Sequence, residues 1–163
     1  MSATSDTIRL EPNPTNGCFG CGGANESGMK LTFDQDNAGR KIVGRFVLGA
    51  RYRGGGGVAH GGIIALLLDE AMGKVSRFRD VRAVTAELTV EYLKPVSVEN
   101  KIVVEAHEEE QLRKGRNLFH VGEIRDAAGT VLARGRGRFV IVGQPERKGL
   151  AVEEKFGSDE TRV

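Results

Sequence analysis

Two adjacent acidic residues, Asp69 and Glu70, interrupt an apolar run and are the first candidates for chemistry. A helix over residues 61 to about 77 would turn them to different surroundings, because each residue rotates the helix by about 100°. Glu70 precedes Lys74 by four positions and Arg77 by seven, a spacing that favours ion pairs and a structural role. The side of Asp69 carries small residues that leave space for a ligand or a partner backbone, namely Gly62, Ala65, Gly73 and Ser76. Asp69 is therefore the candidate catalytic acid, and a carboxylate that only accepts a hydrogen bond from a strand is the alternative.

The expected helix begins at His60-Gly61-Gly62, which supplies no Ser, Thr, Asp or Asn cap. Its first N–H groups and the positive end of its dipole could polarise a carbonyl oxygen, unless water or His60 caps them. Gly61 and Asp69 are eight residues apart, which is about 12 Å along a helix axis. Both can act on one carbonyl only from different subunits, which predicts a two-fold dimer with antiparallel helices.

The elements that must position these residues follow from periodicity. Alternating apolar residues predict a hairpin and then four strands after the helix, at residues 29–33 and 42–48 and then 83–93, 101–107, 117–125 and 130–142. One largely apolar helix must be covered on most sides. The pattern therefore predicts an α+β fold in which a curved antiparallel sheet wraps one long buried helix.

The 163 residues suit one domain, which we expect at residues 16–143 between a flexible lead-in (1–15) and a polar tail (144–163). A net charge of +2 without a basic block argues against nucleic-acid binding. The longest apolar stretch, Ile63–Leu68, is too short to span a membrane. The absence of a signal sequence and the presence of only two close cysteines predict a soluble, cytoplasmic protein.

The run from Gly57 to Gly73, GVAHGGIIALLLDEAMG, resembles the signature of hotdog-fold acyl-CoA thioesterases of the phenylacetate-degradation (PaaI-like) type. Two further segments, CFGCG at 18–22 with Asn25, Gly28 and Met29, and VTAEL at 84–88 through YLKP at 92–95, are similar to that family. The resemblance covers about residues 16–142. It implies a hotdog fold and hydrolysis of an acyl-CoA to free acid and CoA. It also implies a homodimer or a dimer of dimers (homotetramer), with no cofactor and no metal.

The resemblance also implies roles for single residues. Asp69 would attack the thioester carbonyl or activate water, the partner's Gly61 N–H would polarise that carbonyl, and Thr85 would hold the nucleophile or water. His60 would order the turn. The implied substrate-binding residues are Gly62, Gly54, Arg113, Lys114 and Arg116, the last three toward CoA phosphates, with Arg134, Arg136 and Arg138 as a second basic set. Many relatives carry Asn or Gln where this chain has Gly54, so a group that assists the carbonyl or water is missing.

Three alternatives stay open at this point. A hotdog acyl-thioester hydratase would use His60 with Glu70 or Asp69 for proton transfer at carbon. A non-catalytic acyl-CoA binding module is consistent with the glycine at position 54. Cys18 and Cys21 could have a redox or metal role, but a single Cys-x-x-Cys without a second pair or histidines favours two free thiols.

Overall fold

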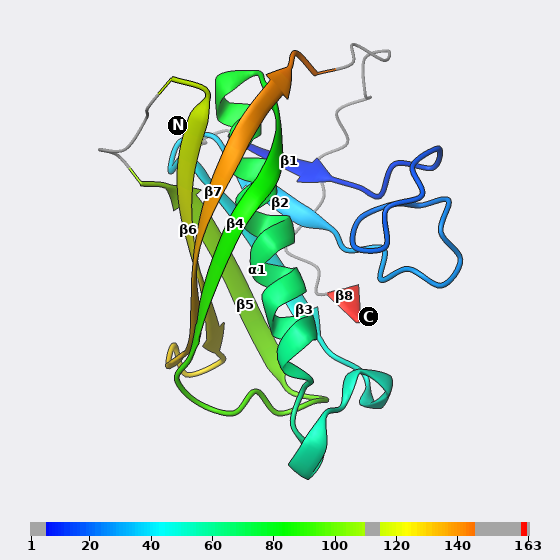
Figure 1. Ribbon diagram of the computed structural model, residues 1–163. Coiled ribbons are helices and arrows are strands. Elements are labelled where there is room, and N and C mark those ends of the chain that lie inside the picture. The colour runs from blue at the N-terminus through cyan, green and yellow to red at the C-terminus, as the bar shows by residue number, and fades with distance from the viewer. Residues whose placement is uncertain (1–5, 110–114, 146–160, 163) are drawn as a thin grey trace, which may run out of the picture.

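One sheet curves around one helix in the computed structural model, which describes residues 6–109, 115–145 and 161–162 (Figure 1). Seven strands follow one another in the order β1-β2-β3-β5-β6-β7-β4, and an eighth, β8, pairs with β3. The strands are β1 (Thr7–Leu10), β2 (Phe33–Asp36), β3 (Lys41–Val47), β4 (Arg82–Tyr92), β5 (Lys101–Glu108), β6 (Asn117–Asp126), β7 (Val131–Gly143) and β8 (Thr161–Arg162). All pairs are antiparallel except β3 with β8. The predicted α+β arrangement is confirmed.

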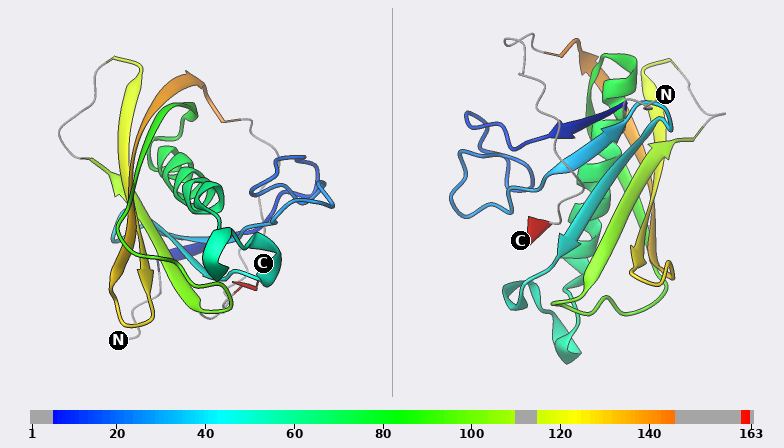
Figure 2. Two further views of the ribbon diagram at one scale, coloured as in Figure 1. Left: turned by 60° about the horizontal axis from the view of Figure 1, so that its bottom comes forward. Right: turned by 180° about the vertical axis from the view of Figure 1, so that it is seen from behind.

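The helix α1 (Gly61–Val75) lies in the hollow of the sheet, which Figure 2 shows curving around it. Short 3₁₀ turns stand before it at Ala50–Tyr52 (η1) and Gly55–Gly57 (η2), and η3 (Ser76–Arg79) continues it. Its buried apolar residues recur every three or four positions: Ile64, Leu67, Leu68, Ala71, Met72 and Val75. Glycines of the sheet let them approach closely, since a Cβ at Gly135 would lie 3.0 Å from Met72 Cε. Each fully buried side chain of this size contributes about 1.5–3 kcal/mol, so packing fixes α1 against the sheet.

The strand β4 forms one edge of the sheet beside α1. It pairs with β7 on one side, and no described strand pairs with its other side. Large apolar side chains along this edge are exposed: 51% for Val84, 58% for Tyr92 and 46% for Leu93. An apolar edge strand of 11 residues is a template for another strand.

A bulge in β4 changes which side chains face the helix. The sequence predicts strict alternation, with Thr85 on the face opposite Leu88 and Val90. The register instead shifts between Thr85 and Glu87. These two residues pair with the adjacent β7 residues Phe139 and Arg138, so Ala86 is an extra, unpaired residue in β4. Thr85 consequently faces α1, as Leu88 and Val90 do. The single-face prediction for this strand is therefore wrong, and the bulge is the reason.

The N-terminal part also differs from the prediction. Residues 29–32 are not a strand, since the N–H groups of Met29 and Leu31 donate to the carbonyls of Phe19 and Gly20 in the preceding loop, and Phe33 begins β2. The hairpin is formed by β2 and β3 instead. Within the expected lead-in, β1 pairs with β2, and within the expected tail, β8 pairs with β3. No helix in the described residues is long and apolar enough to cross a membrane.

A fully buried histidine, His120, makes stability depend on pH. Its Nδ1 lies 2.7 Å from Met72 O, and its ring stacks on Phe139 with centroids 4.7 Å apart. Burial lowers the pKa of His120 from 6.5 to about 4. Between these values the unfolded chain binds more protons than the folded one, so the free energy of unfolding falls as pH falls, by up to about 3 kcal/mol.

We therefore expect the free energy of unfolding, measured by chemical denaturation, to fall between pH 6.5 and 4. In the His120→Asn variant it should fall less steeply over the same range. Asn keeps a donor near Nδ1 but cannot take up the proton, although it loses the ring contact and starts from a lower stability. His107→Asn, at an exposed position of β5, is the matched control that should keep the wild-type slope. A His120→Asn slope equal to that of the wild type would contradict this assignment.

Candidate active site

The Asp69 carboxylate lies between α1 and the bulged part of β4. Thr85 Oγ1 donates a hydrogen bond of 2.7 Å to Asp69 Oδ1. Partial burial raises the pKa of Asp69 above its usual value, and the Thr85 bond opposes this because it favours the ionised form. The carboxylate is thus held at one oxygen, and Oδ2 has no hydrogen-bond partner among the described residues. A positioned, partly desolvated carboxylate with one available oxygen can act as a nucleophile or a general base.

The Thr85→Val variant tests this contact. Valine has nearly the same shape but cannot donate, so the pKa of Asp69 should rise further. If activity needs ionised Asp69, the acidic limb of the kcat/KM profile should move to higher pH. A lost hydrogen bond to a charged group also predicts a rate loss of roughly 10- to 100-fold near neutral pH. Thr89→Val, at an exposed position of the same strand, should leave the profile unchanged; an unshifted limb in Thr85→Val would contradict the contact's role.

The first turn of α1 is partly capped by its own histidine. His60 Nδ1 accepts the N–H of Gly62 at 2.9 Å, and His60 O accepts the N–H groups of Ile63 and Ile64. The alternative that His60 caps the helix is therefore correct for Gly62, and His60 orders the turn. The N–H of Gly61 has no acceptor among the described residues. It is the N–H of this turn that remains available to an external oxygen.

A residue that the sequence analysis did not select, Tyr92, lies over this turn. Its hydroxyl donates to Gly61 O at 3.0 Å, and the residue is 58% exposed. A Cβ at Gly61 would stand 3.5 Å from the Tyr92 ring, which is an ordinary contact. The end of β4 thus lies against the start of α1, a pairing between positions 31 residues apart that periodicity alone does not show.

The glycine loop before the helix is closely packed at its first residue. Gly54 N–H donates to Val58 O at 2.7 Å, and a Cβ at Gly54 would lie 3.0 Å from His60 Cα. Gly56 and Gly57 have φ values of +69° and +81°, which favour glycine. The loop therefore gives the site backbone groups and no side chain at position 54.

The basic residues expected near CoA phosphates are only partly described. Arg113 and Lys114 lie outside the described residues, and exposed Arg116 donates to Ile141 O at 3.0 and 2.8 Å. The second basic set is paired with acids: Arg134 with Glu123 at 2.9 Å, Arg136 with Glu109 at 2.8 Å and Arg138 with Glu87 at 3.4 Å. These three arginines are therefore compensated on the outer face of the sheet.

The second helix acid, Glu70, points to other partners than Asp69. Its Oε2 accepts from Lys74 Nζ at 2.8 Å, as its spacing predicts, and its Oε1 accepts from the Cys18 thiol at 3.4 Å. Arg77 does not join this pair and donates to Gln35 instead. The ion pair with Lys74 supports the predicted structural role of Glu70. The contact between Glu70 and Cys18 was not predicted.

Comparisons with known proteins show what the chain is similar to. The model of the Thioesterase superfamily matches residues 56–133. A solved thioesterase-superfamily protein is 27% identical over 73% of this chain and 57% of its own, with a TM-score of 0.66. A hypothetical thioesterase from Streptococcus pneumoniae, solved with coenzyme A, is 20% identical over 64% of this chain and 82% of its own, with a TM-score of 0.59. The PaaI protein of the E. coli phenylacetic acid degradation operon is 20% identical over 64% of this chain and 75% of its own, with a TM-score of 0.59.

These likenesses confirm the predicted hotdog fold. The chain spans little more than half the length of the first of these proteins. Structures of the Streptococcus pneumoniae thioesterase also exist with alanine replacing an aspartate or a threonine sixteen positions later, each 19% identical to this chain. No protein of curated function matches this sequence.

Proposed function

We propose that the chain is a thioesterase that hydrolyses an acyl-CoA thioester to a free acid and CoA, because the Thioesterase superfamily model matches residues 56–133 and a solved protein of that superfamily is 27% identical. The observation that carries the proposal is the 2.7 Å bond from Thr85 to the partly buried Asp69 carboxylate. The Streptococcus pneumoniae thioesterase bound to coenzyme A supports a CoA thioester as the substrate class. The cytoplasmic location of the present chain remains a prediction from its sequence.

The chemistry follows from the two available groups. Asp69 Oδ2 attacks the carbonyl carbon, or removes a proton from a water that attacks it, while Thr85 holds Oδ1. The carbonyl oxygen becomes an oxyanion in the tetrahedral intermediate, and the N–H of Gly61 donates to it. The C–S bond then breaks, and CoA leaves as its thiolate and takes up a proton. If Asp69 is the nucleophile, water finally hydrolyses the anhydride formed between Asp69 and the acyl group.

The two groups require two copies of the chain. Gly61 and Asp69 belong to one continuous helix and lie about 12 Å apart along its axis. The open apolar edge of β4 supports a second copy as the partner, because two-fold pairing there brings two antiparallel α1 helices together. Each dimer then holds two sites, and a dimer of dimers remains the larger assembly that the sequence predicts.

The substrate contacts that we propose are those that the family resemblance implies. Gly54 and Gly62 would line the entrance beside the first turn of α1, since both adjoin His60. Arg113, Lys114 and Arg116 would meet the phosphates of CoA. Arg116 has its Nε and Nη2 engaged by Ile141 O, which leaves Nη1 for a phosphate oxygen.

Thiol release from short, medium, long and aromatic acyl-CoAs tests the proposed function. We expect turnover with at least one of these classes. Binding of acyl-CoA without thiol release would favour the binding module, and a change in enoyl absorbance without released thiol would favour the hydratase. The hydratase would have to use Asp69, because the Glu70 carboxylate is engaged by Lys74 and Cys18.

A further inference from the structure

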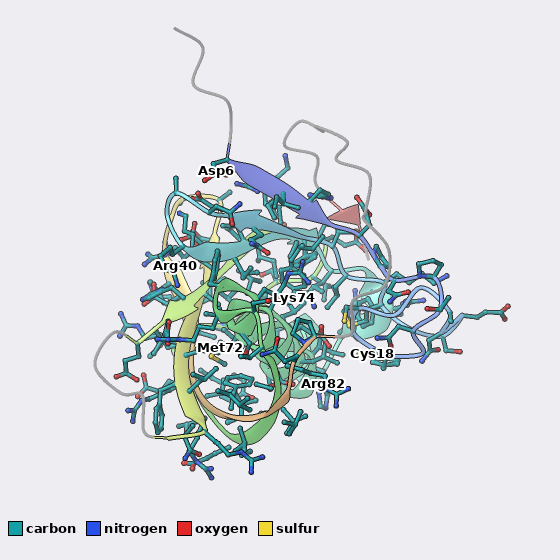
Figure 3. The ribbon with its side chains drawn as sticks, turned by 90° about the horizontal axis from the view of Figure 1, so that it is seen from above. Asp6, Cys18, Arg40, Met72, Lys74 and Arg82 are labelled. Atoms are coloured by element: carbon teal, nitrogen blue, oxygen red, sulfur yellow. The ribbon has the colours of Figure 1, made fainter. Side chains whose placement is uncertain are left out.

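The N-terminal loop brings two thiols to the α1 acid that the proposed hydrolysis does not use. Figure 3 shows Cys18 where this loop approaches the helix that carries Lys74, and the Cys18 thiol lies 3.4 Å from Glu70 Oε1. A Cβ at Gly20 would lie 2.3 Å from that oxygen, and one at Gly22 would lie 2.5 Å from Cys18 N. The loop therefore reaches Glu70 this closely only with glycine at both positions.

Hydrogen bonds hold the loop in this position. Gly22 N–H donates to Cys18 O at 3.0 Å, and Cys18 N–H donates to Asn16 Oδ1 at 2.7 Å. The segment that leads to β2 adds the bonds from Met29 and Leu31 to Phe19 O and Gly20 O, at 2.8 and 2.9 Å. The two cysteines thus stand on a bonded turn that is tied to the sheet.

The three side chains have the spacing of metal ligands. The sulfurs of Cys18 and Cys21 and an oxygen of Glu70 all lie within 4.8 Å of one another. Tetrahedral Zn²⁺ with Zn–S bonds of about 2.3 Å places two sulfurs about 3.8 Å apart. Small side-chain rotations therefore suffice to bring all three atoms onto one ion.

The Glu70 carboxylate is oriented and balanced by Lys74. Lys74 Nζ holds Oε2 at 2.8 Å, both side chains are only 15% exposed, and Lys74 lies over the Phe33 ring. An outer partner of this kind orients a ligating carboxylate, here with Oε1 toward the thiols. The net charge of the site is −2, because two thiolates and the Glu70 carboxylate carry three negative charges and Lys74 carries one positive charge. One divalent ion neutralises this charge in a partly buried site.

We propose that Cys18, Cys21 and Glu70 bind Zn²⁺, with water as the fourth ligand, and that the ion clamps the N-terminal loop onto α1. The site is separate from the proposed hydrolysis, because Asp69 faces β4 while Glu70 faces the loop. A thiol–disulfide exchange role fits less well. An oxygen of Glu70 lies within 4.8 Å of both sulfurs, which supplies a third ligand atom that a dithiol–disulfide pair does not need.

Metal titration of the full chain tests the proposal. After treatment with reductant and chelator, the folded wild type should take up about one Zn²⁺ or Co²⁺ per chain and show sulfur-to-cobalt charge-transfer absorption. Zn²⁺ should raise the Tm and protect both thiols from a thiol reagent. Cys18→Ser and Cys21→Ser should lose the absorption, and Glu70→Gln should bind at least about 10-fold more weakly. Glu105→Gln, which breaks the exposed Lys41–Glu105 pair of 3.3 Å, is the matched control and should bind as the wild type does.

Several results would overturn the site. Folded wild-type chain that takes up neither ion, or whose thiols react equally fast with and without Zn²⁺, would do so even if the variants fail to fold. Metal uptake that survives Cys18→Ser and Cys21→Ser, or that is as tight in Glu70→Gln, would also contradict it. Oxidation to a Cys18–Cys21 disulfide with loss of two hydrogens and no metal uptake would replace the site by a redox pair.

Discussion

Asp69→Asn is expected to lower kcat for acyl-CoA hydrolysis by at least about 100-fold, with little change in folding. Asn keeps the size of the side chain and can still accept the hydrogen bond from Thr85 Oγ1. It offers no carboxylate oxygen, so it can neither form an acyl anhydride nor remove a proton from water. Thiol release under saturating acyl-CoA measures the loss, and circular dichroism checks the fold.

Asp80→Asn is the matched control for this substitution. Asp80 is exposed and has a left-handed backbone with φ of +51°, a conformation that asparagine tolerates well. This variant should retain wild-type turnover. If Asp69→Asn also retained turnover, Asp69 could not be the nucleophile or the general base.

Because Asp69 acts in its ionised form, turnover of the wild type should also fall as pH decreases through the pKa of this group. Burial raises that pKa, so the decline should begin at a higher pH than for an exposed aspartate. A pH–kcat/KM profile of the wild type measures the position of this limb. Turnover that stays constant down to the pKa of an exposed aspartate would contradict the role of a partly buried carboxylate.

Gly61→Pro is expected to lower kcat by about 10²- to 10³-fold, the usual loss when one oxyanion donor is removed. Proline has no N–H but is well tolerated at the first position of a helix. The preceding residue, His60, already has the extended backbone that proline requires, with φ of −62° and ψ of 135°. The substitution therefore removes the proposed donor while α1 keeps its start.

Gly61→Ala separates the lost donor from added bulk. Alanine keeps the N–H, and its Cβ would make an ordinary 3.5 Å contact with the Tyr92 ring. We expect Gly61→Ala to keep turnover within about 10-fold of the wild type, which is far above Gly61→Pro. Equal losses in both variants would show that space at this turn, and not the N–H, limits the reaction.

The parts of the fold with clear periodicity could be predicted from the sequence. The helix and the strands that follow it have regular apolar patterns, and the rotation between Asp69 and Glu70 follows from helix geometry alone. The structure confirms these elements and directs the two acids to different partners. Local rules sufficed because each of these features depends on residues within one element.

Features that depend on the register between elements could not be predicted from periodicity. Strict alternation places Thr85 on the face opposite the helix, and only the family resemblance implied a position beside Asp69. The bulge after Thr85 turns its hydroxyl to Asp69. Tyr92 meets Gly61 only because the end of β4 lies against the start of α1. The same reason explains why Glu70 was not recognised as a partner of Cys18, from which it is separated by 52 residues.

The most direct test of the two-subunit site is to mix two inactive variants. In a dimer of Asp69→Asn with Gly61→Pro, one site combines both defects, and the other combines an intact Asp69 with an intact Gly61. Random exchange makes half of the dimers mixed, so a 1:1 mixture unfolded and refolded together should regain about a quarter of wild-type turnover. The same mixture without refolding, or each variant refolded alone, should stay inactive. Co-refolded dimers that contain both chains and still release no thiol would show that Asp69 and Gly61 do not meet across subunits.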